Sequence, residues 1–177
     1  MTRIVIDVPV LETDRLLLRA PCPADYPAYR AFLATERSRF TGGPLEERHA
    51  WRAFAAMIGH WTMQGFGMWT ITLKGSDAPA GHAGLWYPGT WPEPEIGWTV
   101  YEGYEGKGIA FEAACAVRDH TFGPMGWTTA VSYIAAGNDR SVALARRLGA
   151  VPDASATRPP HAPDCHVFRH PQPGGTR

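Results

Sequence analysis

The sequence has few cysteines, no net charge and no long uninterrupted apolar run. Cys22, Cys115 and Cys165 lie far apart and form no C-x-x-C pair, which argues against a disulfide framework or a zinc site and suits a reducing cytoplasm. Seventeen basic residues balance seventeen acidic ones, so the charge of the whole molecule gives no reason to expect nucleic acid or an anionic membrane as a partner. Any polyanion that binds must be small and locally recognised.

Membrane and metal signals are also weak. Residues 53–73 carry no formal charge, but glycines and polar residues interrupt them, so the segment predicts an amphipathic helix followed by a buried strand instead of a membrane span. The N-terminal run MTRIVIDVPV is too short in apolar residues for a signal peptide. The histidines show no metal-ligand spacing, so we expect no metal. The histidines considered are His49, His60, His82 and His120.

A chain of 177 residues that is 45% apolar is long enough for one domain with its own core. We therefore expect a single domain over residues 1–177, with a core at about residues 11–170 and a disordered tail at 171–177. Strand-like and helical runs alternate without a repeat, which favours an α/β (α+β) fold around one sheet. Strands are predicted at residues 15–19, 68–73, 80–86, 96–101, 127–134 and 165–169, and helices at 23–37, 45–63, 107–122 and 139–148.

The segment EIGWTVYEGYEGKGIAFE (residues 95–112) passes from a strand through a glycine-rich turn into a helix. Such a turn presents free backbone N–H groups at the positive end of a helix, as phosphate binding requires. Lys107 can add a point charge. The spacing excludes two familiar phosphate loops: Gly108 follows Lys107 where a Walker A loop needs Ser or Thr, and the glycines give G-x-x-G-x-G instead of G-x-G-x-x-G.

The turn resembles the pyrophosphate loop of the Gcn5-related N-acetyltransferases (GNAT), written Q/R-x-x-G-x-G/A. It is spelled here by Glu105, Gly106, Lys107, Gly108, Ile109 and Ala110. The resemblance implies that these residues bind the phosphates of acetyl-coenzyme A, mainly through backbone N–H groups. Glu105 alone departs from the pattern. A carboxylate repels a pyrophosphate, so either this side chain points to solvent or coenzyme binding is weakened.

A later block, VSYIAAGNDRSVALARRLGA (residues 131–150), resembles the family's strand and helix with Asn138, Ser141 and Gly149 in place. Asn138 is a natural N-cap and Gly149 a natural helix stop, which explains both without a ligand. Ser141 shares a helical face with Leu144 and Leu148 and is therefore expected to point inward. The family implies that Asn138 and Ser141 lie at the coenzyme, with Ser141 able to protonate the leaving thiolate. A simple bond to the Asn138 cap is equally open.

The opening LETDRLLLRAP resembles the RimJ/RimL-like branch of the family, the ribosomal-protein-alanine acetyltransferases. The resemblance implies a mixed, mostly antiparallel sheet with splayed strands and flanking helices. It also implies acetyl-coenzyme A as co-substrate and an amine acceptor, either a protein N-terminus or a small molecule, in a ternary complex. A homodimer is compatible with the resemblance, but the sequence identifies no interface.

The resemblance also implies that the backbone of Trp98, Thr99 and Val100 bonds the pantetheine arm, with a bulge at Gly97 opening the strand. Glu95 begins this strand and alternates onto the same face as Gly97 and Thr99. We therefore expect Glu95 to be the general base. It could instead be a solvated strand-end residue, with a water chain carrying the proton.

Aromatic residues crowd the expected acceptor side, and residues 86–91 are predicted to form its rim, although large aromatics most often serve the core. The residues are Phe40, Trp51, Trp69, Trp86, Tyr87 and Trp91. Arg37 and Arg39 could meet an acidic acceptor. Two alternatives remain open: a non-catalytic acyl-coenzyme A-binding domain, and an aromatic-rich carbohydrate- or peptide-binding module that owes nothing to the glycine turn.

Overall fold

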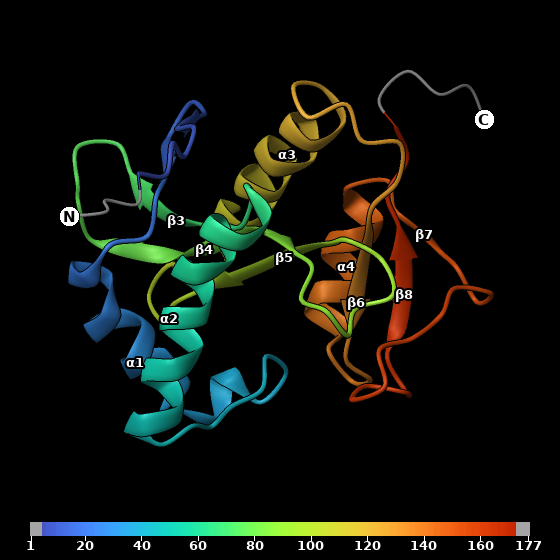
Figure 1. The fold of residues 1–177 in the computed structure, drawn as a ribbon, viewed down its shortest axis with the longest axis horizontal. Coiled ribbons are helices and arrows are strands. Elements are labelled where there is room, and N and C mark those ends of the chain that lie inside the picture. Colours follow the sequence, from blue (N-terminus) through green and yellow to red (C-terminus); the bar gives the residue numbers. More distant parts are fainter. Residues whose placement is uncertain (1–4, 173–177) are drawn as a thin grey trace.

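The computed structural model describes residues 5–172, which build one eight-stranded sheet with the order β1-β2-β3-β4-β5-β6-β8-β7 (Figure 1). All neighbouring strands are antiparallel except β5 and β6. The strands are β1 (Leu11–Glu12), β2 (Leu16–Arg19), β3 (Met68–Leu73), β4 (Pro79–Trp86), β5 (Glu95–Val100), β6 (Val131–Ile134), β7 (Val151–Pro152) and β8 (His166–Arg169). The predicted mixed, mostly antiparallel sheet is confirmed.

Four α-helices and two short 3-10 turns complete the fold: η1 (Pro23–Asp25), α1 (Tyr26–Leu33), η2 (Glu36–Ser38), α2 (Glu47–Gln64), α3 (Ile109–Phe122) and α4 (Asp139–Arg147). The helix predicted at residues 23–37 is shorter than expected. The Ser38 hydroxyl donates to the carbonyls of Leu33 (3.2 Å) and Thr35 (2.7 Å). These bonds satisfy carbonyls that a longer helix would have paired, and the chain turns there.

Most other element ends lie within two residues of the predicted bounds, with one larger difference. The strand expected over residues 127–134 begins only at Val131, because Trp127 follows a turn at Gly126 and packs its ring against the core from a loop. The two-residue strands β1 and β7 were not predicted, since they are too short to show a pattern. Most of the expected disordered tail, residues 173–177, lies outside the described residues.

Alternation along the strands sends one set of side chains to α3 and the other to α1 and α2. Leu18, Trp69 and Ile71 are fully buried in the cluster that also contains Ile109 and Val117 of α3. The opposite cluster joins α1 to α2 and includes Tyr29, Phe32, Phe54, Met57 and Tyr101. Each face of the sheet is therefore closed by its own apolar helix surface.

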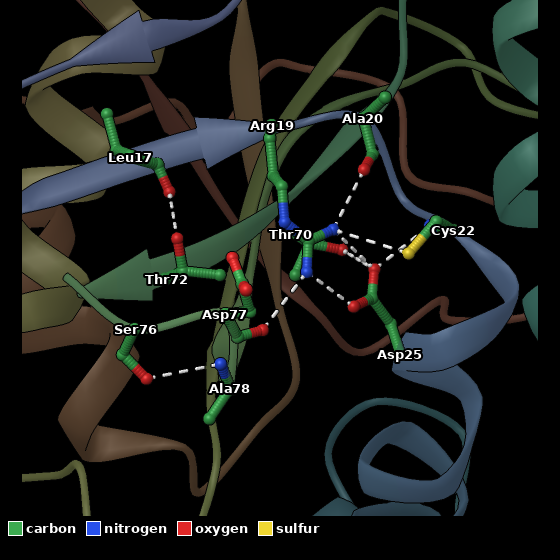
Figure 2. A network of polar contacts seen from close by, with 10 residues as sticks. All are labelled: Leu17, Arg19, Ala20, Cys22, Asp25, Thr70, Thr72, Ser76, Asp77 and Ala78. Atoms are coloured by element: carbon green, nitrogen blue, oxygen red, sulfur yellow. Dashed lines mark hydrogen bonds and ion pairs between the residues drawn. The ribbon is translucent and has the colours of Figure 1, made fainter. Parts of the chain in front are cut away.

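A polar network fixes the point where β2 leaves the sheet for η1 (Figure 2). Asp25 is 3% exposed and accepts two bonds from Arg19, at 2.7 and 2.9 Å. It also accepts bonds from the Cys22 N–H (2.9 Å) and the Thr70 hydroxyl (2.8 Å). Burial alone would raise the pKa of Asp25, but these donors outweigh it and hold the pKa below its ordinary value. The first helices are thereby tied to β3.

Within residues 5–172, no helix is both long and apolar enough to cross a membrane. This agrees with the reading of residues 53–73 as a helix, α2, followed by the strand β3. The three cysteines are free.

Candidate active site

Strands β5 and β6 separate soon after they meet. Their parallel pairing has one register pair, Glu95 with Val131, and the Val131 N–H donates to the Pro94 carbonyl at 3.1 Å. The Ser132 hydroxyl then bonds the Ile96 carbonyl at 2.6 Å and lies 2.9 Å from His170 Nε2. These contacts hold β5 and β6 together at the point where the split between the two strands begins.

Beyond these contacts, the edge of β5 that faces β6 has no paired strand among the described residues. The register with β4 and the bond from Tyr101 N–H to the Ala80 carbonyl (2.8 Å) direct the backbone groups of odd-numbered residues toward β4. The N–H and C=O groups of Trp98 and Val100 therefore face the split. The expectation that the Thr99 backbone bonds the pantetheine arm is therefore wrong, because its N–H and C=O groups point to β4. The side chain of Thr99, and not its backbone, is available to a ligand in the split.

The bulge expected at Gly97 is wrong. The register of β5 with β4 is unbroken from Glu95 to Val100, and the irregularity lies between Ile71 and Thr72 of β3. Gly97 has a different role, because a Cβ there would lie 3.0 Å from the Met68 methyl carbon and 4.0 Å from Glu95 Oε1. The missing side chain leaves room beside the Glu95 carboxylate.

The glycine-rich turn opens a groove of about 1130 Å³ at the start of α3. Gly103, Gly106 and Gly108 all have positive φ, at 83°, 72° and 78°, a conformation that costs glycine least. Gly108 is the N-cap of α3, and no side chain caps it. The first N–H groups of the helix, from Ile109 and Ala110, are thus left for a ligand at the positive end of the helix. Gly106, Gly108, Ile109 and Ala110 all line the groove.

Glu105 lies in this groove, but its charge is not left alone. The carboxylate forms an ion pair with Arg37, which follows α1 and lines the same groove. Neither expected alternative, a side chain in open solvent or an uncompensated repulsion, describes this arrangement. No sequence pattern indicates the pair, since the two residues lie far apart in the chain and no periodicity links them.

Lys107 is placed differently from expectation. Its ammonium donates to the Gly103 carbonyl at 2.7 Å, and its side chain is absent from the described lining of the groove. Its carbonyl accepts a bond from Arg15 at 3.1 Å. Lys107 therefore stabilises the conformation of the turn. This geometry does not support the expectation that its ammonium adds a charge to the groove.

Helix α4 supplies the far wall. The Asn138 side chain caps it by accepting the Ser141 N–H at 3.3 Å, as predicted, and Gly149 follows the helix end at a φ of 83°. Asn138 and Ser141 both line the groove, together with Arg140 and Arg147. Ser141 also lines a second cavity, so its hydroxyl lies where the two spaces join.

The second cavity, of about 620 Å³, lies on the face of the sheet covered by α2. It shares six lining residues with the groove, from the segment after α1, from β5 and from α4: Arg39, Phe40, Thr41, Trp98, Thr99 and Ser141. The side chains of Glu95 and Thr99 and the Cα of Gly97 share the face of β5 that lines it, as their alternation predicted. A ligand in the groove and another in the cavity can therefore meet at the split between β5 and β6.

Glu95 is the carboxylate-bearing residue in the described lining of the cavity. Its Oε2 accepts the Trp91 indole N–H at 2.7 Å. Burial raises the pKa of Glu95 to about 7, although the Trp91 bond and a backbone N–H of Tyr133 favour the charged form. A carboxylate with such a pKa can take a proton near neutral pH. The alternative of a solvated strand-end residue does not fit this burial.

The aromatic residues divide between roles. Phe40, Trp86 and Trp91 line the cavity, whereas Trp69 is fully buried in the core and Trp51 is 60% exposed. Tyr87 serves through its backbone N–H, which donates to His60 Nε2 at 2.9 Å. The loop after β7 adds Pro159, His161 and Ala162. Sequence reasoning identified this segment only as a loop and missed its place at the site.

His60 has a structural role, whereas His82 and His161 line the cavity. His60 Nδ1 bonds the Phe66 carbonyl at 2.8 Å and its ring stacks on Trp86 at 4.5 Å. Burial lowers the pKa of His82 to about 4. No cluster of three or more His, Cys, Asp or Glu suited to a metal occurs in the described part of the chain.

Comparison with known proteins gives concordant results. A family model described as the acetyltransferase (GNAT) domain matches residues 15–151. The structure resembles an acetyltransferase from Agrobacterium tumefaciens str. C58, with 38% identity, a TM-score of 0.89 and coverage of 97% of this chain and 99% of that one. A Bordetella pertussis protein assigned to the GnaT acetyltransferases is 27% identical, with a TM-score of 0.76 and coverage of 92% and 99%.

The RimL ribosomal-protein α-N-acetyltransferase, solved in complex with coenzyme A, shares the fold at 18% identity and a TM-score of 0.72, with coverage of 92% and 97%.

Proposed function

The chain belongs to the GNAT family of acetyltransferases, and we propose that it transfers the acetyl group of acetyl-coenzyme A to an amine in a ternary complex. The observation that carries the proposal is the meeting of two cavities at the split between β5 and β6. One has a phosphate-binding turn at its end, and the other contains Glu95 with a pKa raised to about 7.

The groove suits the coenzyme. The N–H groups at Ile109 and Ala110 face the phosphates, and Arg37, Arg140 and Arg147 add positive charge. The open N–H and C=O groups of Trp98 and Val100 offer an extended arm the hydrogen bonds of an added strand. One of these N–H groups can bond the thioester carbonyl, which favours the charge that develops there.

In the acetyl transfer, the amine nitrogen bonds to the thioester carbon and the carbon–sulfur bond breaks. Glu95 accepts the proton that the amine loses, directly or through water, and Ser141 can donate a proton to the departing sulfur. An α-amine with a pKa near 8 needs about 1.4 kcal/mol to deprotonate at pH 7, whereas a lysine near 10.4 needs about 4.6 kcal/mol. An α-amine or similarly acidic amine therefore demands less of a base with a pKa of about 7.

The opening LETDRLLLRAP favours the RimJ/RimL-like branch, and the fold shared with RimL is consistent with it. We also propose that residues 1–177 form a single domain. The free cysteines favour a cytoplasmic location.

The test combines thiol release from acetyl-coenzyme A with calorimetric titration of coenzyme A. We expect Gly108→Ala to raise the Kd for coenzyme A at least tenfold, because alanine disfavours the positive φ that aims the helix N–H groups. The matched control is Gly75→Ala, which places the same strain, at a φ of 81°, in the turn between β3 and β4. Unchanged affinity in Gly108→Ala would argue against this groove as the coenzyme site.

Coenzyme binding without turnover on any amine would favour a regulatory acyl-coenzyme A-binding domain. No coenzyme binding at all would reject the acetyltransferase proposal and favour a carbohydrate- or peptide-binding module.

A further inference from the structure

We infer that the acceptor is a monoamine carried on a flat apolar body, such as an aromatic amine, an aromatic amino acid or a peptide that begins with an aromatic residue. Polycationic amines are excluded. The inference rests on the proposed acetyltransferase function and names its substrate class. It follows from the charge, the walls and the width of the cavity that contains Glu95.

The cavity offers one carboxylate. Among the described residues that line it, Glu95 is the acidic side chain, Arg39 is the basic one, and His82 and His161 are the histidines. Burial holds the pKa of His82 at about 4, so this ring adds no positive charge at pH 7. A polyamine or aminoglycoside would bring several ammonium groups, of which one could meet Glu95. The others would lie unpaired against apolar walls. Moving these charges out of water without a partner makes the free energy of binding less favourable.

The walls of the cavity are aromatic. Five lining residues carry aromatic rings from α1, the segment after it, β4, the β4–β5 loop and β6: Tyr29, Phe40, Trp86, Trp91 and Tyr133. Aliphatic side chains of α2 and β3, including Met57 and Met68, fill the space between them. Such walls bury a flat apolar group well and offer an alkyl polyamine few polar partners.

The rings are held in place before any ligand binds. Trp86 stacks on His60, whose two nitrogens are both bonded to backbone groups. Trp91 packs on His161 with ring centroids 4.4 Å apart, while its N–H bonds Glu95. Tyr29 lies 5.3 Å from the Phe54 ring. Fixed rings lose little freedom on binding, so the cavity is preorganised for a rigid body of matching shape.

The room beside the base is narrow. The absent side chain of Gly97 leaves a space bounded by Met68 and by Glu95 Oε1. A primary amine fits such a space better than a more substituted amine. The aromatic body then extends toward Trp86 and α2, and the amine faces the split where the groove opens.

The test compares kcat/KM for 2-phenylethylamine, L-phenylalanine and the peptide Phe-Ala-Ala with that for 1,5-diaminopentane and spermidine. We expect at least one aromatic monoamine to exceed both polycations by a hundredfold or more. The ranking of the three aromatic compounds distinguishes a free amine, a free amino acid and a peptide N-terminus as the source. Arg39→Gln should lower kcat/KM more for L-phenylalanine than for 2-phenylethylamine if the carboxylate of the amino acid is bound there.

Two variants probe the cavity. Trp86→Leu should lower kcat/KM at least tenfold more for the preferred aromatic compound than for ethylamine, whereas the exposed Trp51→Leu should change neither. Ala56 is exposed on α2 at the cavity wall, and Ala56→Glu supplies a second carboxylate. This variant should raise kcat/KM for 1,5-diaminopentane at least fivefold.

Calorimetric titration of coenzyme A distinguishes a failure of the proposed acetyltransferase function from a failure of the proposed substrate class. Loss of coenzyme binding would remove the proposed function itself. Coenzyme binding with polycations turned over as fast as aromatic monoamines, or an equal effect of Trp86→Leu on all acceptors, would overturn the substrate class and leave the acetyltransferase standing.

Discussion

At the scale of single residues, the chemistry of the site depends on Glu95. Burial raises its pKa to about 7, while the Trp91 N–H at 2.7 Å keeps its carboxylate oriented. As a base it must be deprotonated to act, so activity should rise with pH through about 7 and fall about tenfold per unit below it. The ionisation of the acceptor amine adds a limb of its own nearer the amine's pKa.

Glu95→Gln should lower kcat/KM by about 10² to 10⁴, the usual contribution of a positioned base, and remove the limb near pH 7. The pH dependence of kcat/KM from 5.5 to 9, with one acceptor, measures both. Glu12→Gln, at a side chain that is 65% exposed and away from both cavities, is the control. A variant that keeps the limb near pH 7 would assign it to another group.

Glu105 and Arg37 form the second residue-scale feature, an ion pair within the coenzyme groove. Arg37→Gln would leave the Glu105 carboxylate facing the phosphates without its partner, and we expect the Kd for coenzyme A to rise about tenfold, a loss of about 1.4 kcal/mol. Removing the carboxylate as well, in Arg37→Gln with Glu105→Gln, should recover most of this affinity.

The cycle of the two single variants and the double variant, titrated calorimetrically at low and moderate salt, gives the coupling energy. Additive effects would show that the pair does not act as a unit at the coenzyme.

At the scale of secondary-structure elements, the joint between β2 and η1 depends on Asp25 (Figure 2). Asp25→Asn removes the charge that Arg19 and two neighbouring donors satisfy, and we expect a loss of about 3–5 kcal/mol, as for other buried pairs broken on one side. Urea unfolding measures it, and the exposed Asp14→Asn is the control. A loss below about 1 kcal/mol would show that the network contributes little.

The sign of the pH dependence follows from the lowered pKa of Asp25. The contribution of its carboxylate is fully present above the ordinary pKa of the unfolded chain and is lost as the pH falls through the lower pKa of the folded state. Asp25→Asn should therefore flatten the decline in stability on the acid side of the profile.

Most elements were predictable from local pattern, and the exceptions have physical causes. The strand over residues 68–73 is present with the predicted bounds, because its buried residues and the turn at Gly75 define both ends. Ser38 shortened the first helix through side-chain bonds that no periodicity reveals. The Gly97 bulge was wrong because the split between β5 and β6 needs no irregularity in the β4–β5 ladder.

The same division applies to the site. Glycines at positive φ, the Asn138 cap and the alternation of Glu95 with Thr99 follow from sequence, since each depends on neighbours along the chain. The Arg37–Glu105 pair and the His161–Trp91 stack join distant segments. Only the packed fold brings such residues together.

At the scale of the whole molecule, the described chain divides at the split (Figure 1). Strands β1 to β5 with α1 to α3 lie on one side, and β6, α4, β7 and β8 on the other. Besides the single β5–β6 register pair, the Ser132 bond to Ile96 and the Arg118 bond to the Leu148 carbonyl at 2.9 Å join the two sides. The Trp98 side chain packs against buried clusters on both.

The proposed coenzyme groove is lined from both sides of this division, by the turn before α3 and by α4. A ligand there adds contacts across the split that the protein alone lacks, so its binding should stabilise the two sides together. At a hundred times its Kd, coenzyme A contributes about 2.7 kcal/mol, which for a domain of this size raises the Tm by roughly 5–11 °C.

Hydrogen exchange locates the effect. The amides of Trp98 and Val100, which face the split, and those at the start of α4 should gain protection together when coenzyme A binds, because one ligand bridges both sides. The Asp25 joint lies away from the groove and serves as the internal reference. Protection confined to the β5 side would mean that α4 does not take part in holding the coenzyme, and the role assigned to Ser141 would then fail with it.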